Sequence, residues 1–407
     1  MNLKFIYCIF IILSFTGIHG VVLAFENGNE IGLDTNFRTV VDSRGIAVEV
    51  PLEIERVATI SDGLVEEMMY ILRVDDKIVG LGSKGTIYTG DYTYQTENGS
   101  NFTISEGKNI ALALSPGLKD LSLFADYGSA LNLESLAALD PDLVIIRLGD
   151  STLLSCQDET AIRSIDRIES LGIPVVVLHS PNCNDNSDPT MISEEIRIIG
   201  QTFGKEDEAE RVIATLESAK DFITQRTKDL TDNEKKEVLL LGLSSLHRTE
   251  TAAGISWGLR SPESYMIEEI VNANNAFQSD TNGFQIISYE QILSTDPDVI
   301  VLGTASGYHS PGELYDAPYY KNLRELSAVK NQHVVSLPYE PRNAARRIEF
   351  PIDLMVIAKA TYPELFEDVD LRDWTLSFYQ DVFGVDYDQA KELWKAELME
   401  WSQEKDI

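Results

Sequence analysis

The sequence predicts an α/β protein of two lobes, each with a central, mainly parallel sheet flanked by helices, and one long helix that joins them. The first observation is a helix-turn-strand stretch that occurs twice, at 132–146 and 288–302. The second is that short apolar runs alternate with helical patterns in both halves, which is typical of parallel sheets covered on both faces. The third is a long helical segment between the halves, at 204–232.

Each copy of the repeated stretch begins with a residue type that caps helices, Asn132 in the first and Ser288 in the second. An Asp-Pro pair follows, and proline disfavours helical geometry in the residue before it. Proline has no backbone N–H and is tolerated at the first position of a strand, and an apolar run comes next in both copies. The stretch therefore predicts a short helix, a turn and a buried strand in each lobe.

The segment from Glu206 to Leu230 contains neither glycine nor proline, and its apolar residues recur at helical spacing. Acidic residues at its start and Lys228 near its end suit the helix dipole. At 1.5 Å per residue it would extend roughly 38 Å, enough to connect two domains. An ordinary surface helix is the alternative interpretation. A continuous connecting helix predicts little hinge motion between the lobes.

These patterns divide the chain into five parts. The first lobe contains an insertion rich in Gly, Tyr, Thr, Ser and Asn, and long connections of this kind are usually functional or disordered. The last part is acidic and aromatic with helical periodicity, and we expect it to pack because exposed aromatic side chains are costly. The expected boundaries are an N-terminal signal or anchor at 1–24, the first lobe at 37–203 with its insertion at about 84–118, the connecting helix at 204–232, the second lobe at 236–361 and a helical tail at 362–407.

The charge balance excludes one class of partner. The 407 residues include 33 Lys and Arg against 66 Asp and Glu, for a net charge of −33. Such a chain repels phosphate backbones, so we expect no nucleic-acid partner. An acidic, solubilising surface on an exported or salt-adapted protein is the simplest interpretation.

The N-terminus predicts export. Lys4 precedes an apolar run with no acidic residue until Glu26, and Val22-Leu23-Ala24 offers small residues at a cleavage point. The run spans roughly 20 residues, so an uncleaved membrane anchor is the alternative. In both cases we expect an extracytoplasmic protein, periplasmic or at the cell surface.

Two cysteines lie outside the N-terminal segment, Cys156 and Cys183. Both follow apolar strand-like runs, and loops that leave the same edge of adjacent parallel strands could meet. A disulfide between them would stabilise the protein by about 3–4 kcal/mol in the chain-entropy model. Two unrelated thiols are the alternative. Asn98 and Asn101 begin adjacent glycosylation sequons, which suit an exported surface loop.

Several short motifs follow one another along the chain: Val41-Asp42-Ser43-Arg44-Gly45, Val48-Glu49-Val50-Pro51 with Glu55-Arg56-Val57, Leu171-Gly172-Ile173-Pro174-Val175, and the two Asp-Pro-Asp units at 140–142 and 296–298. Their order resembles the class III solute-binding proteins of ABC importers, which capture iron-siderophore complexes, haem or cobalamin. The resemblance covers about residues 37–365, and the insertion and the tail depart from it. It implies the class III periplasmic-binding-protein fold, a metal chelate captured between two lobes, delivery to a permease in the membrane, no catalytic activity, no cofactor of its own and a monomer.

In that family one glutamate on each lobe docks onto arginines of the permease, and the resemblance assigns this role to Glu134 and Glu290. Two exposed carboxylates far apart would suit two guanidinium partners. The alternative is local, because a carboxylate in the first turn of a helix contributes about 0.3–1 kcal/mol through the helix dipole alone.

Ligand contacts in such proteins come from loops at the carboxyl ends of strands, facing the crevice between lobes. Aromatic faces and arginines suit a large, flat, often anionic chelate. Local packing is the alternative for each aromatic residue, and salt bridges to Glu340 and Glu349 are the alternative for the arginines. The predicted ligand-binding residues are Ser61, Asp62, Tyr88, Tyr127, His247, Arg248, Trp257, Phe284, Tyr339, Arg342, Arg346 and Arg347.

Two other functions compete. A receptor for a bare transition-metal ion would use several histidines and a carboxylate, and His179, His247 and His309 follow strand-like runs. A secreted serine hydrolase would use the G-x-S-x-G match around Ser256, with His309 or His333 and Asp296 or Asp298 completing a triad. That elbow needs a strand directly before the serine and a helix directly after it, and the stretch at 249–253 is a poor strand.

Overall fold

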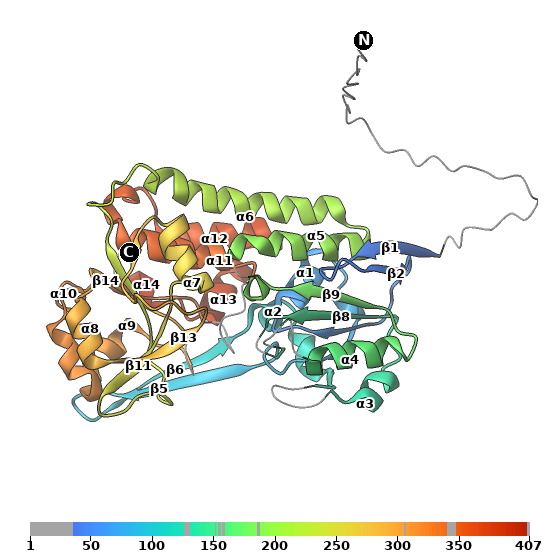
Figure 1. Cartoon of the computed structure of the whole chain (residues 1–407), viewed down its shortest axis with the longest axis horizontal. Helices are drawn as coiled ribbons and strands as arrows, with labels where there is room; N and C mark the ends of the chain where they lie inside the picture. Colours follow the sequence, from blue (N-terminus) through green and yellow to red (C-terminus); the bar gives the residue numbers. More distant parts are fainter. Residues whose placement is uncertain are drawn as a thin grey trace, which may run out of the picture. The chain divides into compact units, whose positions relative to one another are not determined.

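The computed structural model describes residues 36–125, 131–150, 152–153, 156, 159–184, 188–304, 307–339 and 347–404. These residues belong to one structural unit, 36–407 (Figure 1). The expected N-terminal signal lies outside the described residues. No helix in the described part of the chain is long and apolar enough to span a membrane.

The sheet of the first lobe has five parallel strands in the order β7-β4-β3-β8-β9. Its two central strands, β3 and β8, are buried along their whole length, as expected for a parallel sheet covered on both faces. The strands are β3 (Val57–Ile60), β4 (Ile78–Leu81), β7 (Ser122–Leu123), β8 (Leu143–Leu148) and β9 (Val175–His179). The surrounding elements are the antiparallel pair β1 (Phe37–Val41) and β2 (Ala47–Pro51), the helices α1 (Leu64–Ile71), α3 (Leu133–Ala138), α4 (Glu159–Glu169) and α5 (Ile192–Phe203), and the 3-10 turns η1 (Asp75–Lys77), η3 (Pro181–Cys183) and η4 (Pro189–Met191).

The sheet of the second lobe is mixed. Its order is β13-β11-β10-β14-β15, with β12 also paired to β10. Strands β12, β14 and β15 continue the parallel plan around β10, whereas β11 runs antiparallel to both of its neighbours, β10 and β13. The strands are β10 (Glu237–Gly242), β11 (Ala252–Trp257), β12 (Asn274–Asn275), β13 (Phe284–Ser288), β14 (Val299–Leu302) and β15 (Val334–Ser336). The helical elements are α7 (Pro262–Tyr265) with a π turn η5 (Met266–Ile270), α8 (Tyr289–Thr295), α9 (Pro311–Asp316), η6 (Pro318–Glu325), α10 (Ser327–Lys330) and α11 (Phe350–Thr361).

The repeated sequence unit builds the same structure in both lobes. Asn132 accepts a hydrogen bond from the Ser135 N–H at 3.0 Å, and Ser288 accepts one from the Gln291 N–H at 3.1 Å within a capping box. The residue before each proline then takes a left-handed conformation, with φ of 46° at Asp140 and 41° at Asp296.

The second aspartate of each unit ties the turn to the sheet. Asp142 Oδ2 accepts hydrogen bonds from the N–H groups of Glu55 and Arg56, at 2.8 and 2.9 Å, just before β3. Asp298 Oδ2 accepts one from the Glu237 N–H at 2.9 Å, at the start of β10. Each unit therefore anchors the beginning of a neighbouring central strand.

The connecting helix α6 (Glu206–Thr227) lies within the predicted segment and runs beside α5 and α11 (Figure 1). The insertion contains a two-stranded hairpin, β5 (Thr89–Gln95) and β6 (Asn101–Lys108), then α2 (Ile110–Leu114) and η2 (Pro116–Asp120). The tail forms η7 (Pro363–Leu365), α12 (Leu371–Phe383), α13 (Tyr387–Ala396) and α14 (Trp401–Glu404).

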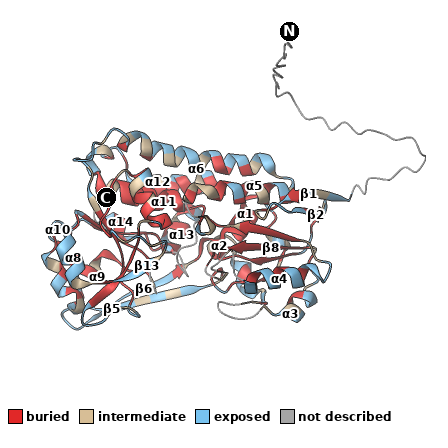
Figure 2. Ribbon diagram, viewed as in Figure 1, coloured by how far each residue is buried: buried red, intermediate tan, exposed pale blue. Residues whose placement is uncertain are grey.

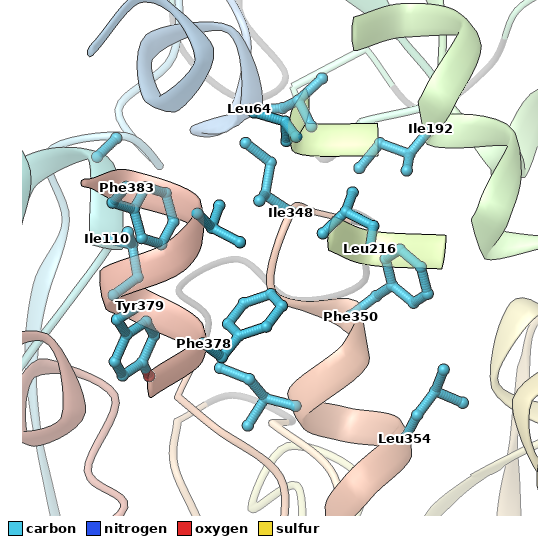
Figure 3. Packing of buried hydrophobic residues seen from close by; sticks show 14 of the residues in the cluster. Leu64, Ile110, Ile192, Leu216, Ile348, Phe350, Leu354, Phe378, Tyr379 and Phe383 are labelled. Atoms are coloured by element: carbon cyan, nitrogen blue, oxygen red, sulfur yellow. The ribbon is translucent and has the colours of Figure 1, made fainter. Parts of the chain in front are cut away.

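One hydrophobic core runs through both lobes and the tail. Leu64 of α1, Leu216 of α6 and Phe350 of α11 belong to it, together with Phe378 and Tyr379 of α12 (Figure 3). Buried residues also fill both sheets, while α3, α4 and α8 present exposed faces (Figure 2). Because protein interiors are close-packed, a core shared in this way resists separation of the lobes.

Candidate functional site

The carboxyl end of β3 is held by a buried hydrogen-bonded carboxylate. Asp62 is 1% exposed, and its carboxylate accepts hydrogen bonds from the Ser83 hydroxyl and from the N–H and hydroxyl of Thr152, the last two at 3.1 and 2.9 Å. Ser61 accepts hydrogen bonds at 3.2 Å from the N–H groups of Gly63 and Val65 at the start of α1. Both predicted ligand residues therefore organise the loops at the carboxyl ends of the first lobe's strands, the edge expected to face the other lobe and called the crevice edge below.

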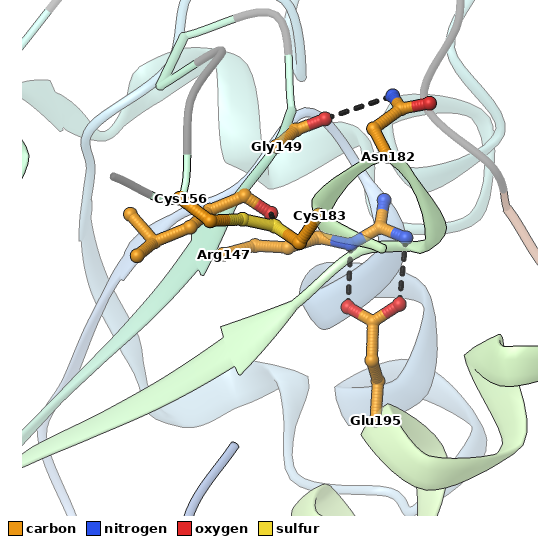
Figure 4. The surroundings of a disulfide bond; sticks show 7 residues. Arg147, Gly149, Cys156, Asn182, Cys183 and Glu195 are labelled. Atoms are coloured by element: carbon orange, nitrogen blue, oxygen red, sulfur yellow. Dashed lines mark hydrogen bonds and ion pairs between the residues drawn. A yellow bond between two sulfur atoms is a disulfide. The ribbon is translucent and has the colours of Figure 1, made fainter. Parts of the chain in front are cut away.

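A buried ion pair lies beside this edge. The Arg147 guanidinium on β8 donates to both carboxylate oxygens of Glu195 on α5, at 2.7 and 2.9 Å (Figure 4). Asp150 lies 3.6 Å from the same guanidinium and accepts a hydrogen bond from the Asp62 N–H at 2.8 Å. Burial raises the pKa of Glu195 to about 7 and that of Asp150 to about 6, because a low-dielectric site disfavours the ionised form.

The predicted disulfide position lies in the same region. Cys156 and Cys183 are joined, with their Cα atoms 5.5 Å apart (Figure 4). The loop after β9 is further tied to the loop after β8 by Asn182, whose Nδ2 donates to the Gly149 carbonyl at 3.0 Å. The loops at the carboxyl ends of β8 and β9 are therefore held together covalently.

Arg347 connects the two lobes from inside the protein. It precedes α11 and is 2% exposed, and its guanidinium lies 3.5 Å from the carboxylate of Glu67 on α1. From the sequence, the alternative role for Arg347 was a salt bridge to Glu340 or Glu349. Glu67 lies 280 positions away, so no local sequence pattern could predict this contact. Burial is the largest cause that raises the pKa of Glu67, and the Arg347 charge opposes it.

The second lobe contributes Trp257 to the carboxyl ends of its strands. Trp257 is 4% exposed and lines a small cavity of about 20 Å³ together with Gly303, Thr304 and Pro338, which follow β14 and β15. A side chain at Gly303 would meet the Trp257 ring at 3.1 Å, so glycine permits this packing. The carboxylates of Glu263 and Asp353 also line the cavity.

Tyr88 and Tyr339 meet where the hairpin crosses between the lobes. A Cβ atom on Gly90 would lie 2.6 Å from the Tyr339 hydroxyl and 2.9 Å from the Tyr88 ring, so the hairpin backbone passes directly against both. Tyr339 is buried and its N–H donates to the Glu397 carbonyl at 2.8 Å, whereas Tyr88 is 40% exposed. Aromatic rings from both lobes therefore come together at this point.

His247, Arg248 and Phe284 lie near one another on the second lobe. The His247 and Phe284 rings meet edge to face at 5.8 Å, and Phe284 is 53% exposed. The Arg248 guanidinium lies 3.7 Å from the centre of the Tyr319 ring, a cation–π geometry. Arg248 is also 3.8 Å from the buried carboxylate of Glu313.

Glu313 is the centre of a network that the sequence did not reveal. One of its oxygens accepts hydrogen bonds from the hydroxyls of Tyr92 and Tyr319, at 2.8 and 2.9 Å, and the other lies 2.8 Å from His309 Nδ1. Tyr92 belongs to the hairpin, so this network fastens the insertion of the first lobe to the second. His309 precedes Ser310, the N-cap of α9, so its contact with Glu313 follows no helical spacing that the sequence could show.

The two predicted docking residues occupy equivalent places. Glu134 is the second residue of α3 and Glu290 is the second residue of α8, and both are exposed. Neither forms an ion pair with another residue in the described part of the chain.

The geometry around Ser256 differs from a nucleophile elbow. Ser256 lies inside the antiparallel strand β11, which begins at Ala252, so the expectation of a poor strand up to 253 was wrong at its end. Its hydroxyl is fully buried and donates to the Leu240 carbonyl at 2.7 Å. Among the described residues no three His, Cys, Asp or Glu side chains gather as metal ligands would. The predicted ligand residues Tyr127, Arg342 and Arg346 lie outside the described residues.

Comparison with known proteins agrees with this architecture. The family model described as "Periplasmic binding protein" matches residues 122–341, more than half of the chain. The molybdate-binding protein MolA of Haemophilus influenzae is 23% identical over 310 residues, covering 71% of this chain and 79% of MolA. The Fe(3+)-citrate-binding protein YfmC of Bacillus subtilis is 26% identical over 205 residues, covering 50% of this chain and 55% of YfmC.

Solved structures show the same fold. A periplasmic solute-binding protein from Veillonella parvula superposes with a TM-score of 0.69 at 22% identity, covering 91% of this chain and all of that one. MolA bound to molybdate superposes with a TM-score of 0.64 at 21% identity, covering 86% of this chain and 99% of MolA. The chain therefore belongs to the periplasmic binding protein family, as a substrate-binding protein of the ABC-transporter type with the class III two-lobe fold.

Proposed function

We propose that this protein is the extracytoplasmic receptor of an ABC importer that captures a metal chelate between its lobes and delivers it to the membrane permease. The observation that carries the delivery role is the pair of equivalent helices α3 and α8. Each presents one exposed glutamate, Glu134 or Glu290, at its second position, and each is anchored to its own sheet by the aspartate that follows the turn. Two carboxylates held rigidly on two lobes can bind two guanidinium groups of one partner.

The chemistry of the crevice edges supports an anionic, metal-containing cargo. Aromatic rings from both lobes meet at Tyr88 and Tyr339, and Phe284 and His247 offer partly exposed rings on the second lobe. Such faces suit the flat organic part of a chelate, and arginines suit its carboxylate or catecholate groups. Among the relatives, one is named for Fe(3+)-citrate and another for molybdate, which share a negative charge and a metal centre.

The cargo can be identified with a defined set of probes. Protein from its host, purified without denaturation, would be examined by native mass spectrometry and visible absorption. The stripped protein would then be titrated with ferric citrate, haemin and cyanocobalamin, with molybdate as the competing inorganic oxyanion. We expect saturable binding of at least one chelate at micromolar concentration or below. Binding of molybdate with no response to any chelate would contradict the proposed cargo.

Docking can be tested separately from cargo binding. We expect Glu134→Ala with Glu290→Ala to abolish uptake through the permease while the affinity for the chosen chelate stays within about twofold, because both side chains are exposed and lie on helices outside the crevice edges. A matched control is Glu53→Ala with Glu217→Ala, which removes the same charge from two other exposed positions. Loss of chelate binding in the first variant, or equal loss of uptake in the control, would contradict the docking role.

A further inference from the structure

A second cavity lies where the insertion and the tail meet the second lobe. Its volume is about 450 Å³, within the range of small-molecule sites. One wall is the hairpin β5–β6, another is the segment 308–316 that leads into and forms α9, and the third is 398–401 in the tail. The hairpin and the tail both lie outside residues 122–341, which match the family model.

The walls of this cavity are strongly aromatic. Tyr94 and Phe102 face each other across the hairpin with their ring centres 5.3 Å apart. Tyr94, Tyr308 and Trp401 are each less than a tenth exposed, so their positions are set by packing, whereas Phe102 is 46% exposed at the opening. Tyr315 completes the set of rings.

The only charged side chains among the lining residues are carboxylates. Asp316 and Glu400 are exposed members of the wall, and none of the lining residues is Lys, Arg or His. Burial, and to a lesser degree the charges of Asp316 and Glu313, raise the pKa of Tyr94 to about 12. The cavity therefore disfavours an additional negative charge, including that of an anionic ligand.

We propose that this cavity binds a small organic cation with an alkylated or aryl-bearing ammonium group. The faces of aromatic rings carry negative charge density and attract a cation that lies within about 6 Å of the ring centre. An alkylated ammonium is weakly hydrated, so it loses little on leaving water for an aromatic cavity, and the carboxylates of Asp316 and Glu400 supply its counter-charge. An anion would meet both carboxylates without a compensating base.

The hairpin gives this site a connection to the rest of the molecule. Tyr92 on the same hairpin binds the buried carboxylate of Glu313 in the second lobe, and Glu97 forms an ion pair of 2.6 Å with Arg324. The cavity wall is therefore held against the second lobe on both sides of Tyr94, and the site is formed before any ligand enters.

Isothermal titration calorimetry of the whole protein with benzyltrimethylammonium, choline and 3,3-dimethylbutan-1-ol tests the proposal. Choline and 3,3-dimethylbutan-1-ol have nearly the same shape, but only choline carries a positive charge. We expect saturable binding of benzyltrimethylammonium and at least tenfold weaker binding of the alcohol than of choline. No binding of either cation, or equal affinity for choline and the alcohol, would overturn the proposal.

Variants locate the site. Asp316→Asn with Glu400→Gln should weaken benzyltrimethylammonium binding at least tenfold, and Phe102→Ala should weaken it by a smaller factor, because all three side chains are exposed and their loss leaves the core intact. The control Glu53→Gln with Glu217→Gln removes the same charge elsewhere and should leave binding unchanged. Equal weakening in the control would show a general charge effect and overturn the assignment, as would unchanged affinity in the first variant.

Discussion

Glu66 makes stability depend on pH in a way that one substitution can isolate. It lies on α1 and is 1% exposed, and the Thr59 hydroxyl donates a hydrogen bond to its carboxylate. Burial raises its pKa from 4.5 to about 7, against the opposing effect of that hydrogen bond. Because the folded protein holds this proton more tightly than the unfolded chain, it binds more protons than the unfolded chain between about pH 4.5 and 7. The free energy of unfolding therefore falls as the pH rises through this window.

The size of the effect follows from the shift. One pKa unit corresponds to 1.36 kcal/mol, so ionising Glu66 in the folded protein costs roughly 3 kcal/mol well above pH 7. Glu66→Gln keeps the size of the side chain and a carbonyl that can accept from Thr59, but it removes the titration. The free energy of unfolding of the variant minus that of the natural protein should therefore increase by about 2–3 kcal/mol as the pH rises from 5 to 8.

Urea unfolding at pH 5, 6, 7 and 8, followed by far-ultraviolet circular dichroism at constant ionic strength, measures this difference. The comparison cancels the contributions of Asp150 and Glu195, whose pKa values burial also raises, because both proteins retain them. Glu53→Gln, at an exposed position, is the matched control for the loss of one carboxylate. If the Glu66→Gln difference did not vary with pH, or were larger at pH 5 than at pH 8, the carboxylate would not be protonated in the folded state and the reasoning would be refuted.

Two further stability predictions concern the crevice edge of the first lobe. Arg147→Met should lower the free energy of unfolding by about 3–5 kcal/mol, because it leaves the Glu195 carboxylate buried without the guanidinium that binds both of its oxygens. Adding Glu195→Leu should restore part of this loss, since Asp150 still lacks its partner. Equal losses in the single and the double variant, measured by urea unfolding, would contradict this. Cys156→Ser with Cys183→Ser should lower the free energy of unfolding by about 3–4 kcal/mol, given the sequence separation of 27 residues. Dithiothreitol should lower the free energy of unfolding of the natural protein by the same amount and leave that of the variant unchanged. A natural protein insensitive to dithiothreitol would count against a stabilising disulfide.

The insertion changes how a two-lobe receptor can move. A hairpin of the first lobe that binds Glu313 and Arg324 of the second adds a tie between the lobes in addition to α6 and the shared core. Opening the lobes would break the hydrogen bond from Tyr92 to the buried Glu313 carboxylate, and a hydrogen bond to a charged group contributes about 1.5–3 kcal/mol. The hairpin therefore adds to the expectation that the lobes move little.

The sequence by itself determined the elements and their duplication. Helix caps, periodicity and Asp-Pro turns depend on residues a few positions apart, so Asn132 and Ser288 could be assigned as caps and α6 could be placed between the lobes before any contact was known. The reversed direction of β11 was not foreseen, because strand direction depends on which strands lie alongside.

The tertiary structure decided which side chains meet. Asp62 and Ser61 were placed correctly at a strand end, but their hydrogen bonds with the first-lobe loops depend on how those loops fold back. Arg347 contacts Glu67, which is 280 positions away in the sequence, and Tyr92 binds Glu313, which is 221 positions away. Such partners share no local pattern, because they are set by the path of the whole chain. The aromatic cavity arises in the same way, from an insertion and a tail that only the folded chain brings together.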